Sequence, residues 1–228
     1  MIKGKAKTYF TGCFIAIAAI LYYFILTTGG QTLVTCEYLA IILCFVYALL
    51  SCGKSTLWIL AGLAFTLGAD YCLVVANPIQ QLGGMLFFMG AQTMYAIYLH
   101  LQSRNTVLLW IRIGLVALAE GIAWIVLGEN LDPLAAVSMY YYANLIMNLI
   151  EAFTIFRSEK LLSIAFVLFL LCDTVIGLQV ACGGYLAIDS SSVLYQIIFM
   201  PFHLSWFFYL PSQVLIALRV GTETSAKG

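Results

Sequence analysis

The sequence predicts an all-α integral membrane protein, a polytopic bundle of eight transmembrane helices with both termini in the cytoplasm. Three observations lead to this fold class. Of the 228 residues, 64% are hydrophobic and only 9% are charged, whereas a soluble domain averages about 25% charged residues. The apolar residues form eight long runs. Basic residues gather in every second connection between these runs, which orients a chain in a membrane.

Each apolar run is long enough to cross the hydrocarbon layer, for which a helix needs about 20 residues. The runs occupy residues 9–27, 33–52, 55–76, 82–101, 106–127, 133–156, 160–182 and 193–219. Because the connections are short, consecutive helices should be antiparallel neighbours. No connection has room for a soluble domain, so residues 1–228 are predicted to form a single transmembrane domain. We interpret the first run as a retained span, since it exceeds the roughly 7–15 apolar residues of a signal peptide.

The basic residues give the orientation, because lysine and arginine favour the cytoplasmic side of a membrane. Nine of the ten lie on one side of the eight-span arrangement: Lys3, Lys5, Lys7, Lys54, Arg104, Arg157, Lys160, Arg219 and Lys227. The opposite connections contain only the acidic Glu129, Asp132 and Asp189. Both termini are therefore predicted to be cytoplasmic, in the plasma membrane if the chain is bacterial. The net charge of zero argues against a nucleic-acid partner.

Two aspartates lie inside long apolar runs. Asp70 is within LAGLAFTLGADYCLVVA and Asp173 is within IAFVLFLLCDTVIGLQVAC. An ionised carboxylate at such a depth costs roughly 2.5–3.5 kcal/mol. We expect this cost only where the carboxylate faces a protein interior or a wet cavity and takes part in function.

A polar stripe follows the sixth run. Tyr140, Asn144, Asn148 and Glu151 are spaced by four, four and three residues and so share one face of a helix. The stripe either makes hydrogen bonds between helices or lines a polar cavity. Arg112, in the preceding run, lies at a depth similar to that of Glu151. We expect the two to form an ion pair, with binding of a headgroup or substrate as the alternative role for Arg112.

Other reactive side chains carry weaker signals. The seven cysteines show no C-x-x-C pair and no histidine at metal-ligand spacing. Phosphate-loop, nucleophile-elbow and zinc-protease motifs do not occur. The sequence thus predicts no metal and no cofactor. His203, in the middle of the eighth run near Pro201, is more typical of a hydrogen-bonded core residue than of a ligand.

Four segments, read in order, resemble the motifs of the YhhN-like lysoplasmalogenase family, which are small eight-span membrane proteins. FTLGAD, which ends at Asp70, is similar to F-S-L-L-G-D, and FLLCD, which ends at Asp173, is similar to F-x-x-S-D. FMGAQTMY at 88–95 is similar to F-x-x-A-H-x-x-Y, with Gln92 in place of the histidine. YLPSQVLIAL at 209–218 is similar to Y-x-x-x-Q-x-L-I-x-L.

The resemblance implies that a divergent member of this family hydrolyses the vinyl ether bond of lysoplasmalogens. The products would be a fatty aldehyde and a glycerophospho-ethanolamine or -choline headgroup. One carboxyl would protonate the alkene, and the other would stabilise the oxocarbenium cation and activate water. We assign Asp70 and Asp173 as this catalytic pair, expected to hold about one proton between them. Six residues could bind the lysophospholipid substrate: Gln92, Tyr95, Tyr140, Asn144, Tyr209 and Gln213.

Two other classes of function stay open beside the enzyme. Intramembrane acids and proline-kinked helices also mark ion pathways, which suits a proton-coupled transporter of small molecules. A catalytically inactive lipid-binding membrane protein is the third class, because Gln92 cannot transfer a proton near neutral pH. The sequence favours the ether hydrolase.

Overall fold

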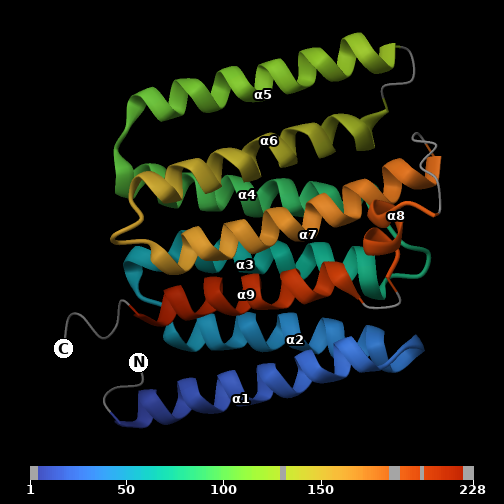
Figure 1. The fold of residues 1–228 in the computed structure, drawn as a ribbon. Coiled ribbons are helices and arrows are strands. Elements are labelled where there is room, and N and C mark those ends of the chain that lie inside the picture. The colour runs from blue at the N-terminus through green and yellow to red at the C-terminus, as the bar shows by residue number, and fades with distance from the viewer. Residues whose placement is uncertain (1–4, 129–131, 185–190, 201–202, 223–228) are drawn as a thin grey trace.

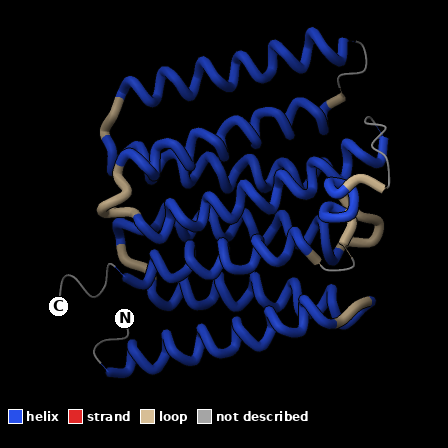
Figure 2. Tube along the Cα trace, in the orientation of Figure 1, coloured by secondary structure: helices blue, strands red, loops and turns tan. Residues whose placement is uncertain are grey.

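The computed structural model describes residues 5–128, 132–184, 191–200 and 203–222, which contain helices and no strands (Figure 2). The all-α prediction is therefore confirmed. The long helices are α1 (Lys5–Thr27), α2 (Gly30–Ser51), α3 (Leu57–Asp70), α4 (Gln81–Ser103), α5 (Thr106–Leu127), α6 (Pro133–Thr154), α7 (Lys160–Gly184) and α9 (Leu204–Thr222). Three short pieces accompany them: the 3-10 helix η1 (Lys54–Thr56), the π-helix η2 (Tyr71–Val75) and α8 (Val193–Ile198).

The long helices lie side by side, with α1 and α5 at opposite edges of the bundle (Figure 1). The most extensive packing joins α7 to α9, α3 to α4 and α4 to α6, so these five helices form the interior. Their core is apolar and closely filled, with Leu63, Tyr95, Phe166 and Phe169 all at most 1% exposed. The edge helix α5 packs mainly on α6. Its remaining surface is apolar, as a helix that faces lipid requires.

Glycines on α3 and α4 allow these two helices to approach closely. A Cβ atom at Gly62 would lie 2.2 Å from Cε1 of Tyr95, and one at Gly90 would lie 2.7 Å from Cδ1 of Phe65. Each glycine therefore leaves room for an aromatic ring of the opposite helix. This reciprocal arrangement, typical of helices packed within membranes, fixes α4 against the helix that ends at Asp70.

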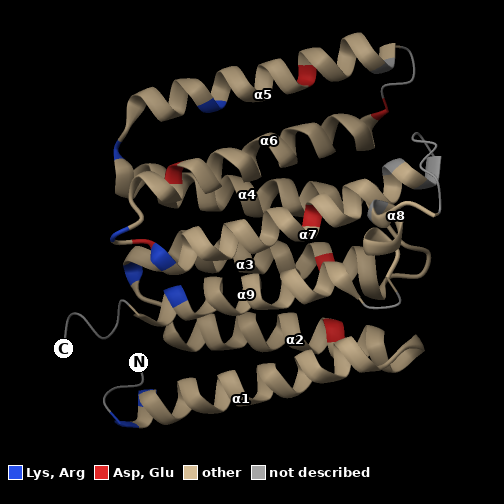
Figure 3. Ribbon diagram, in the orientation of Figure 1, with Lys and Arg blue, Asp and Glu red and all other residues tan. Residues whose placement is uncertain are grey.

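Seven helical segments are long and apolar enough to cross a membrane: α1, α2, the η1–α3–η2 segment, α4, α5, α7 and α9. The eighth expected span, α6, has 22 residues but carries the polar stripe. It nonetheless runs alongside α5 and α7 through the bundle (Figure 1). Helix α1 begins and helix α9 ends at the same end of the bundle, where Lys7 Nζ donates to the carbonyl of Gly221. Lys and Arg residues also gather towards that end (Figure 3).

The eighth apolar run differs from its prediction, because residues 193–219 do not form one helix. They form α8 and α9, which are separate helices. The carbonyl at the end of α8, on Ile198, accepts a hydrogen bond from Gln179 Nε2 at 2.9 Å, so a side chain replaces the next helical turn. His203 precedes α9 and accepts from the N–H of Phe207, so it is not in the middle of a span. A proline in this interval opposes a continuous helix, since it has no N–H.

Some sequence predictions fall on residues outside the described ranges. They concern Lys3, Glu129, Asp189, Pro201 and Lys227.

Candidate functional site

Asp70 is the last residue of α3, at the point where the α-helix passes into the π-helix η2. Its side chain is buried, with 3% of the residue exposed. The hydroxyl of Tyr209, on α9, donates to Asp70 Oδ2 at 2.7 Å. Single π-turns occur frequently at functional sites. A carboxyl that the sequence places in hydrocarbon is thus held in the protein interior by a phenol.

Asp173 lies in α7 and is held in the same way. The hydroxyl of Tyr141, on α6, donates to Asp173 Oδ2. Asp173 is less deeply buried than Asp70, with an intermediate exposure. The neighbouring residues make a parallel contact, since the hydroxyls of Tyr142 and Thr174 lie 3.1 Å apart. Two successive side-chain pairs therefore join α6 to α7 beside the second aspartate.

Aromatic rings connect the two aspartate–tyrosine pairs. The ring of Phe88, on α4, lies 5.7 Å from that of Tyr141 and 6.4 Å from that of Tyr209. We refer to Asp70, Tyr209, Phe88, Tyr141 and Asp173 as the aspartate cluster. Phe88 of α4 thus links the two aspartate–tyrosine pairs, whose side chains come from α3, α6, α7 and α9.

Three other predicted substrate-binding residues are buried and have polar atoms without a hydrogen-bond partner among the described residues. These atoms are Gln92 Nε2, Tyr95 Oη and Gln213 Oε1. Buried polar atoms are nearly always paired with protein or water, so each of the three has bonding capacity left for a ligand or a water. Gln92 and Tyr95 share one face of α4 with Phe88.

The remaining two candidates, Tyr140 and Asn144, belong to a different group of residues. Arg112 on α5 donates from Nη2 to Glu151 Oε2 at 2.8 Å, which confirms the ion pair expected from sequence. Its Nη1 donates to the side-chain oxygens of Asn144 and Asn148 at 3.1 and 2.9 Å. The polar stripe of α6 therefore faces inward and surrounds one guanidinium.

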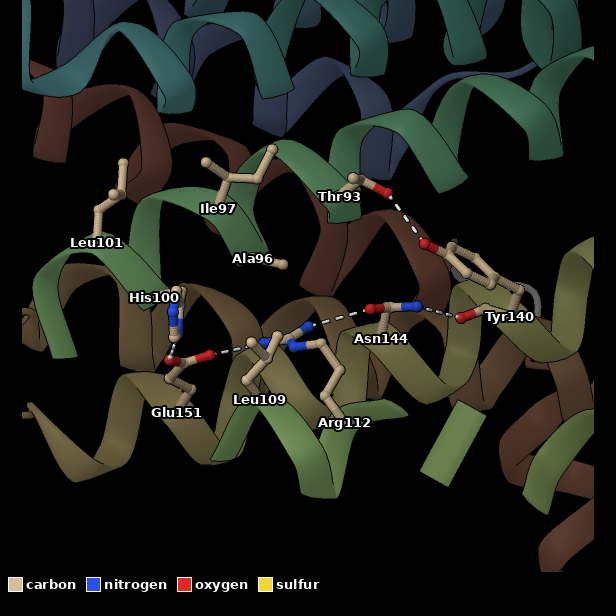
Figure 4. Close-up of a pocket in the computed structure, with 10 residues that line it drawn as sticks. All are labelled: Thr93, Ala96, Ile97, His100, Leu101, Leu109, Arg112, Tyr140, Asn144 and Glu151. Carbon is tan, nitrogen blue, oxygen red and sulfur yellow. Dashed lines mark hydrogen bonds and ion pairs between the residues drawn. The ribbon is translucent and has the colours of Figure 1, made fainter. Parts of the chain in front are cut away.

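This polar group borders a cavity of about 220 Å³ between α4, α5 and α6 (Figure 4). Tyr140 lies at one end, where its hydroxyl is 3.4 Å from Thr93 Oγ1, and His100 lies at the other. Asn148 links the group to α4, since its Nδ2 donates to Gln92 Oε1 at 2.8 Å. Gln92, which replaces the histidine of the motif, is thus a hydrogen-bond acceptor in the Arg112 group.

Tyr141 and Phe88, which complete the aspartate cluster, were not predicted from the sequence. A signal for Tyr141 was present, because α6 and α7 are consecutive and Tyr141 and Asp173 lie at equal distances from the turn near Arg157. The same comparison of depths led to the Arg112–Glu151 pair. No comparable signal exists for Phe88, whose role depends on how α4 packs against non-consecutive helices.

A second buried ionic group was not predicted from the sequence either. Arg219 donates to both carboxylate oxygens of Glu159 at 2.6 Å and to the hydroxyl of Tyr98 at 2.5 Å. Tyr98 in turn donates to Glu159 Oε1 at 2.8 Å. This group connects the end of α9 with α4 and with the turn that precedes α7. Its members all lie at the basic end of the bundle, so it supports the helix ends rather than the aspartate cluster.

Comparison with known proteins agrees with the motifs. The family model described as the YhhN family matches residues 30–220. This range runs from the start of α2 into the last turn of α9 and includes every residue of the aspartate cluster. No curated protein and no solved structure matches the chain.

Proposed function

Since the chain belongs to the YhhN family, we propose that it is an integral membrane hydrolase that cleaves the vinyl ether bond of lysoplasmalogens. The products are a fatty aldehyde and a glycerophospho-headgroup. The observation that carries this proposal is the aspartate cluster, in which each of two intramembrane carboxyls accepts a hydrogen bond from a tyrosine.

The chemistry requires one carboxyl with a proton and one without. The acid delivers its proton to the alkene carbon remote from the ether oxygen, which leaves an oxocarbenium cation. Water then adds to the cationic carbon and loses a proton to the second carboxylate. The resulting hemiacetal collapses to an aldehyde and the free alcohol of the glycerophospho-headgroup. Paired carboxyls serve glycosidases for the same reason, because their transition state is also an oxocarbenium ion.

Burial assigns the two roles. We assign the acid to Asp70, which is almost fully enclosed, because a buried carboxyl avoids the cost of an isolated charge when it keeps its proton. Asp173 is more exposed and is better placed to meet water. In both residues the tyrosine bonds to Oδ2. Oδ1, which has no hydrogen bond to any described residue, is left for proton transfer.

The proposal includes a membrane arrangement of eight crossings with both termini in the cytoplasm. The proximity of Lys7 to Gly221 supports an even number of crossings. The gathering of Lys and Arg at that end supports its cytoplasmic location (Figure 3). In this arrangement Asp70 and Asp173 lie in the half of the bundle away from the cytoplasm.

Two observations favour the alternative functions. The interruption between α8 and α9 is the kind of broken helix on which transporters place ion sites. Gln92 at the histidine position of the motif favours an inactive lipid-binding protein. Aldehyde release distinguishes the hydrolase from both alternatives, because neither of them cleaves the lipid.

The test uses the purified full-length protein with vinyl-ether and ordinary acyl lysolipids, and follows aldehyde and headgroup by mass spectrometry. We expect aldehyde only from the vinyl ether. Asp70→Asn and Asp173→Asn should each lower the rate at least about 100-fold, as loss of a general acid or base does. Glu120→Gln, which removes a carboxyl from the edge helix α5, is the matched control. Turnover retained in both asparagine variants would refute the catalytic assignment.

A further inference from the structure

The cavity between α4, α5 and α6 lies beside a buried cation that the proposed reaction does not use. Arg112 is 8% exposed, and its neighbours on α6 take up only part of its bonding capacity. We propose that this cavity binds the phosphodiester headgroup of a membrane phospholipid, whose acyl or alkyl chain leaves between α4 and α5. This site is separate from the aspartate cluster.

Hydrogen-bond donors without acceptors point to an anionic ligand. Arg112 has five N–H groups, and three of them bond to Asn144, Asn148 and Glu151. Its Nε–H and one Nη2–H have no partner among the described residues. His100 Nδ1, at the same cavity, is a buried atom that likewise has no hydrogen-bond partner among the described residues, and it is a donor when it carries the ring proton. Phosphate oxygens are strong acceptors for such donors.

Glu151 limits the charge that the cavity can accept. It accepts hydrogen bonds from Arg112 at 2.8 Å and from Ser103 at 2.6 Å, so it holds the guanidinium in place. Its own negative charge balances that of Arg112, and His100 Nδ1 lies only 3.9 Å from it. A phosphodiester, with one negative charge, suits this setting better than a doubly charged phosphomonoester.

The walls of the cavity indicate a lipid rather than a soluble ester. Ile97 and Leu101 on α4 and Leu109 on α5 are apolar residues that line the cavity (Figure 4). Leu101 and Leu109 are 53% and 37% exposed, so the apolar walls continue to the outer surface of the bundle. Because α5 packs mainly on α6, the gap between α4 and α5 faces the bilayer. A hydrocarbon chain can therefore follow these walls outward.

The size of the cavity matches a headgroup. Its volume of about 220 Å³ is below the roughly 300 Å³ at which pockets begin to enclose drug-sized ligands. A whole phospholipid does not fit, and only the part that carries the phosphate needs to enter. The cavity lies at the end of α4 that is near Arg104, so the lipid would come from the leaflet on the basic side.

The experiment measures binding of a 1-alkyl lysophosphatidylcholine to the purified full-length protein in maltoside detergent. This probe has a saturated ether and cannot be cleaved as a vinyl ether. Ala96→Phe places a ring in the cavity without removing the Arg112–Glu151 pair. Ile113→Phe, on the lipid-facing side of α5, adds the same kind of ring outside it. Two further ligands, a 1-alkylglycerol of equal chain length and free glycerophosphocholine, separate the contributions of phosphate and chain.

We expect Ala96→Phe to raise the Kd of the probe at least tenfold and Ile113→Phe to change it less than twofold. The alkylglycerol and the free headgroup should each bind the unaltered protein at least tenfold more weakly than the probe. The proposal would be overturned if Ala96→Phe bound the probe as tightly as the unaltered protein does. It would also be overturned if the unaltered protein bound the alkylglycerol or the free headgroup as tightly as the probe. Aldehyde release from a vinyl ether is measured separately. Failure of turnover with intact probe binding would therefore count against the hydrolase and not against this site.

Discussion

At the scale of single residues, the hydroxyls of Tyr209 and Tyr141 decide the orientation of the two aspartates. Each donates to one carboxyl oxygen, Oδ2, and each ring is fixed by contact with Phe88. A carboxyl inside a helical bundle has several side-chain rotamers available. The hydrogen bond from the tyrosine selects among them and so determines where the other carboxyl oxygen lies.

Removal of either hydroxyl should therefore lower catalysis more than it lowers stability. Tyr209→Phe and Tyr141→Phe keep the rings and lose a hydrogen bond to a carboxyl, which is worth about 1.5–3 kcal/mol for the charged Asp173 and about 0.5–1.5 kcal/mol for the protonated Asp70. Since about 1.4 kcal/mol corresponds to a factor of ten, we expect aldehyde release to fall about tenfold or more in Tyr141→Phe and about two- to tenfold in Tyr209→Phe. Steady-state rates and thermal unfolding in detergent would be measured on the same preparations.

The chain offers a matched control for this pair. The hydroxyl of Tyr142 contacts Thr174 and not an aspartate, so Tyr142→Phe should lose a similar contact while the rate is retained. If Tyr142→Phe lowered the rate as much as Tyr141→Phe does, the effect would belong to α6–α7 packing rather than to the orientation of Asp173.

At the scale of the helices, the attachment of α5 depends on a single polar contact point. This helix packs mainly on α6, and the polar part of that interface is the guanidinium of Arg112 with Asn144, Asn148 and Glu151. Unlike the interior helices, α5 has few buried apolar side chains to hold it. The ion pair should therefore contribute a large share of the energy that keeps α5 in place.

Glu151→Gln should destabilise the protein strongly, because it leaves the buried guanidinium of Arg112 without a counter-charge. Loss of one partner of a buried ion pair typically costs roughly 3–5 kcal/mol. We expect a clear fall in the midpoint of thermal unfolding in detergent. Glu120→Gln also removes an acid, from a residue of α5 that makes no ion pair with any described residue, and should leave the midpoint almost unchanged. Equal midpoints for the two variants would show that α5 is held by apolar packing alone.

Consecutive helices were predictable from the sequence, and their side-chain contacts were predictable in part. The predicted runs match the helices within a few residues up to α7, because apolar length and short connections determine them. The Arg112–Glu151 pair followed from matched depth on helices joined by a short turn. The Asp70–Tyr209 bond could not be derived in this way, since α3 and α9 are far apart in the chain and periodicity does not say which helices pack together.

The division of the last run into α8 and α9 was not predicted either. Hydropathy is continuous through this region, so an apolar pattern alone indicates one span. The structure ends α8 with a side-chain hydrogen bond from Gln179 to the carbonyl of Ile198. Such a substitute for the next turn depends on a residue of α7, and the hydropathy of residues 193–219 carries no information about it.

At the scale of the whole molecule, the proposed topology of eight crossings depends on α6. Its hydropathy is too low for it to be counted as a span by composition, because Asn144, Asn148 and Glu151 reduce the average. The structure shows that these three side chains bond to Arg112 and do not face lipid. A polar group that is paired within the bundle does not carry the full cost of exposure to hydrocarbon, so composition underestimates the ability of α6 to cross.

Reporter fusions on either side of α6 would test this crossing. With both termini cytoplasmic, a reporter joined after Gly128 should lie outside the cytoplasm, whereas reporters joined after Arg157 or after the last residue should lie inside it. A fluorescent protein that matures only in the cytoplasm and a phosphatase that is active only outside it give opposite readings at each position. If α6 did not cross, the fusions after Gly128 and Arg157 would report the same side, and α7 and α9 would then carry the end of the chain to the side opposite its beginning. The contact of Lys7 with Gly221 supports the arrangement in which α6 crosses, so we expect the outside reading after Gly128 and the inside reading at the other two positions.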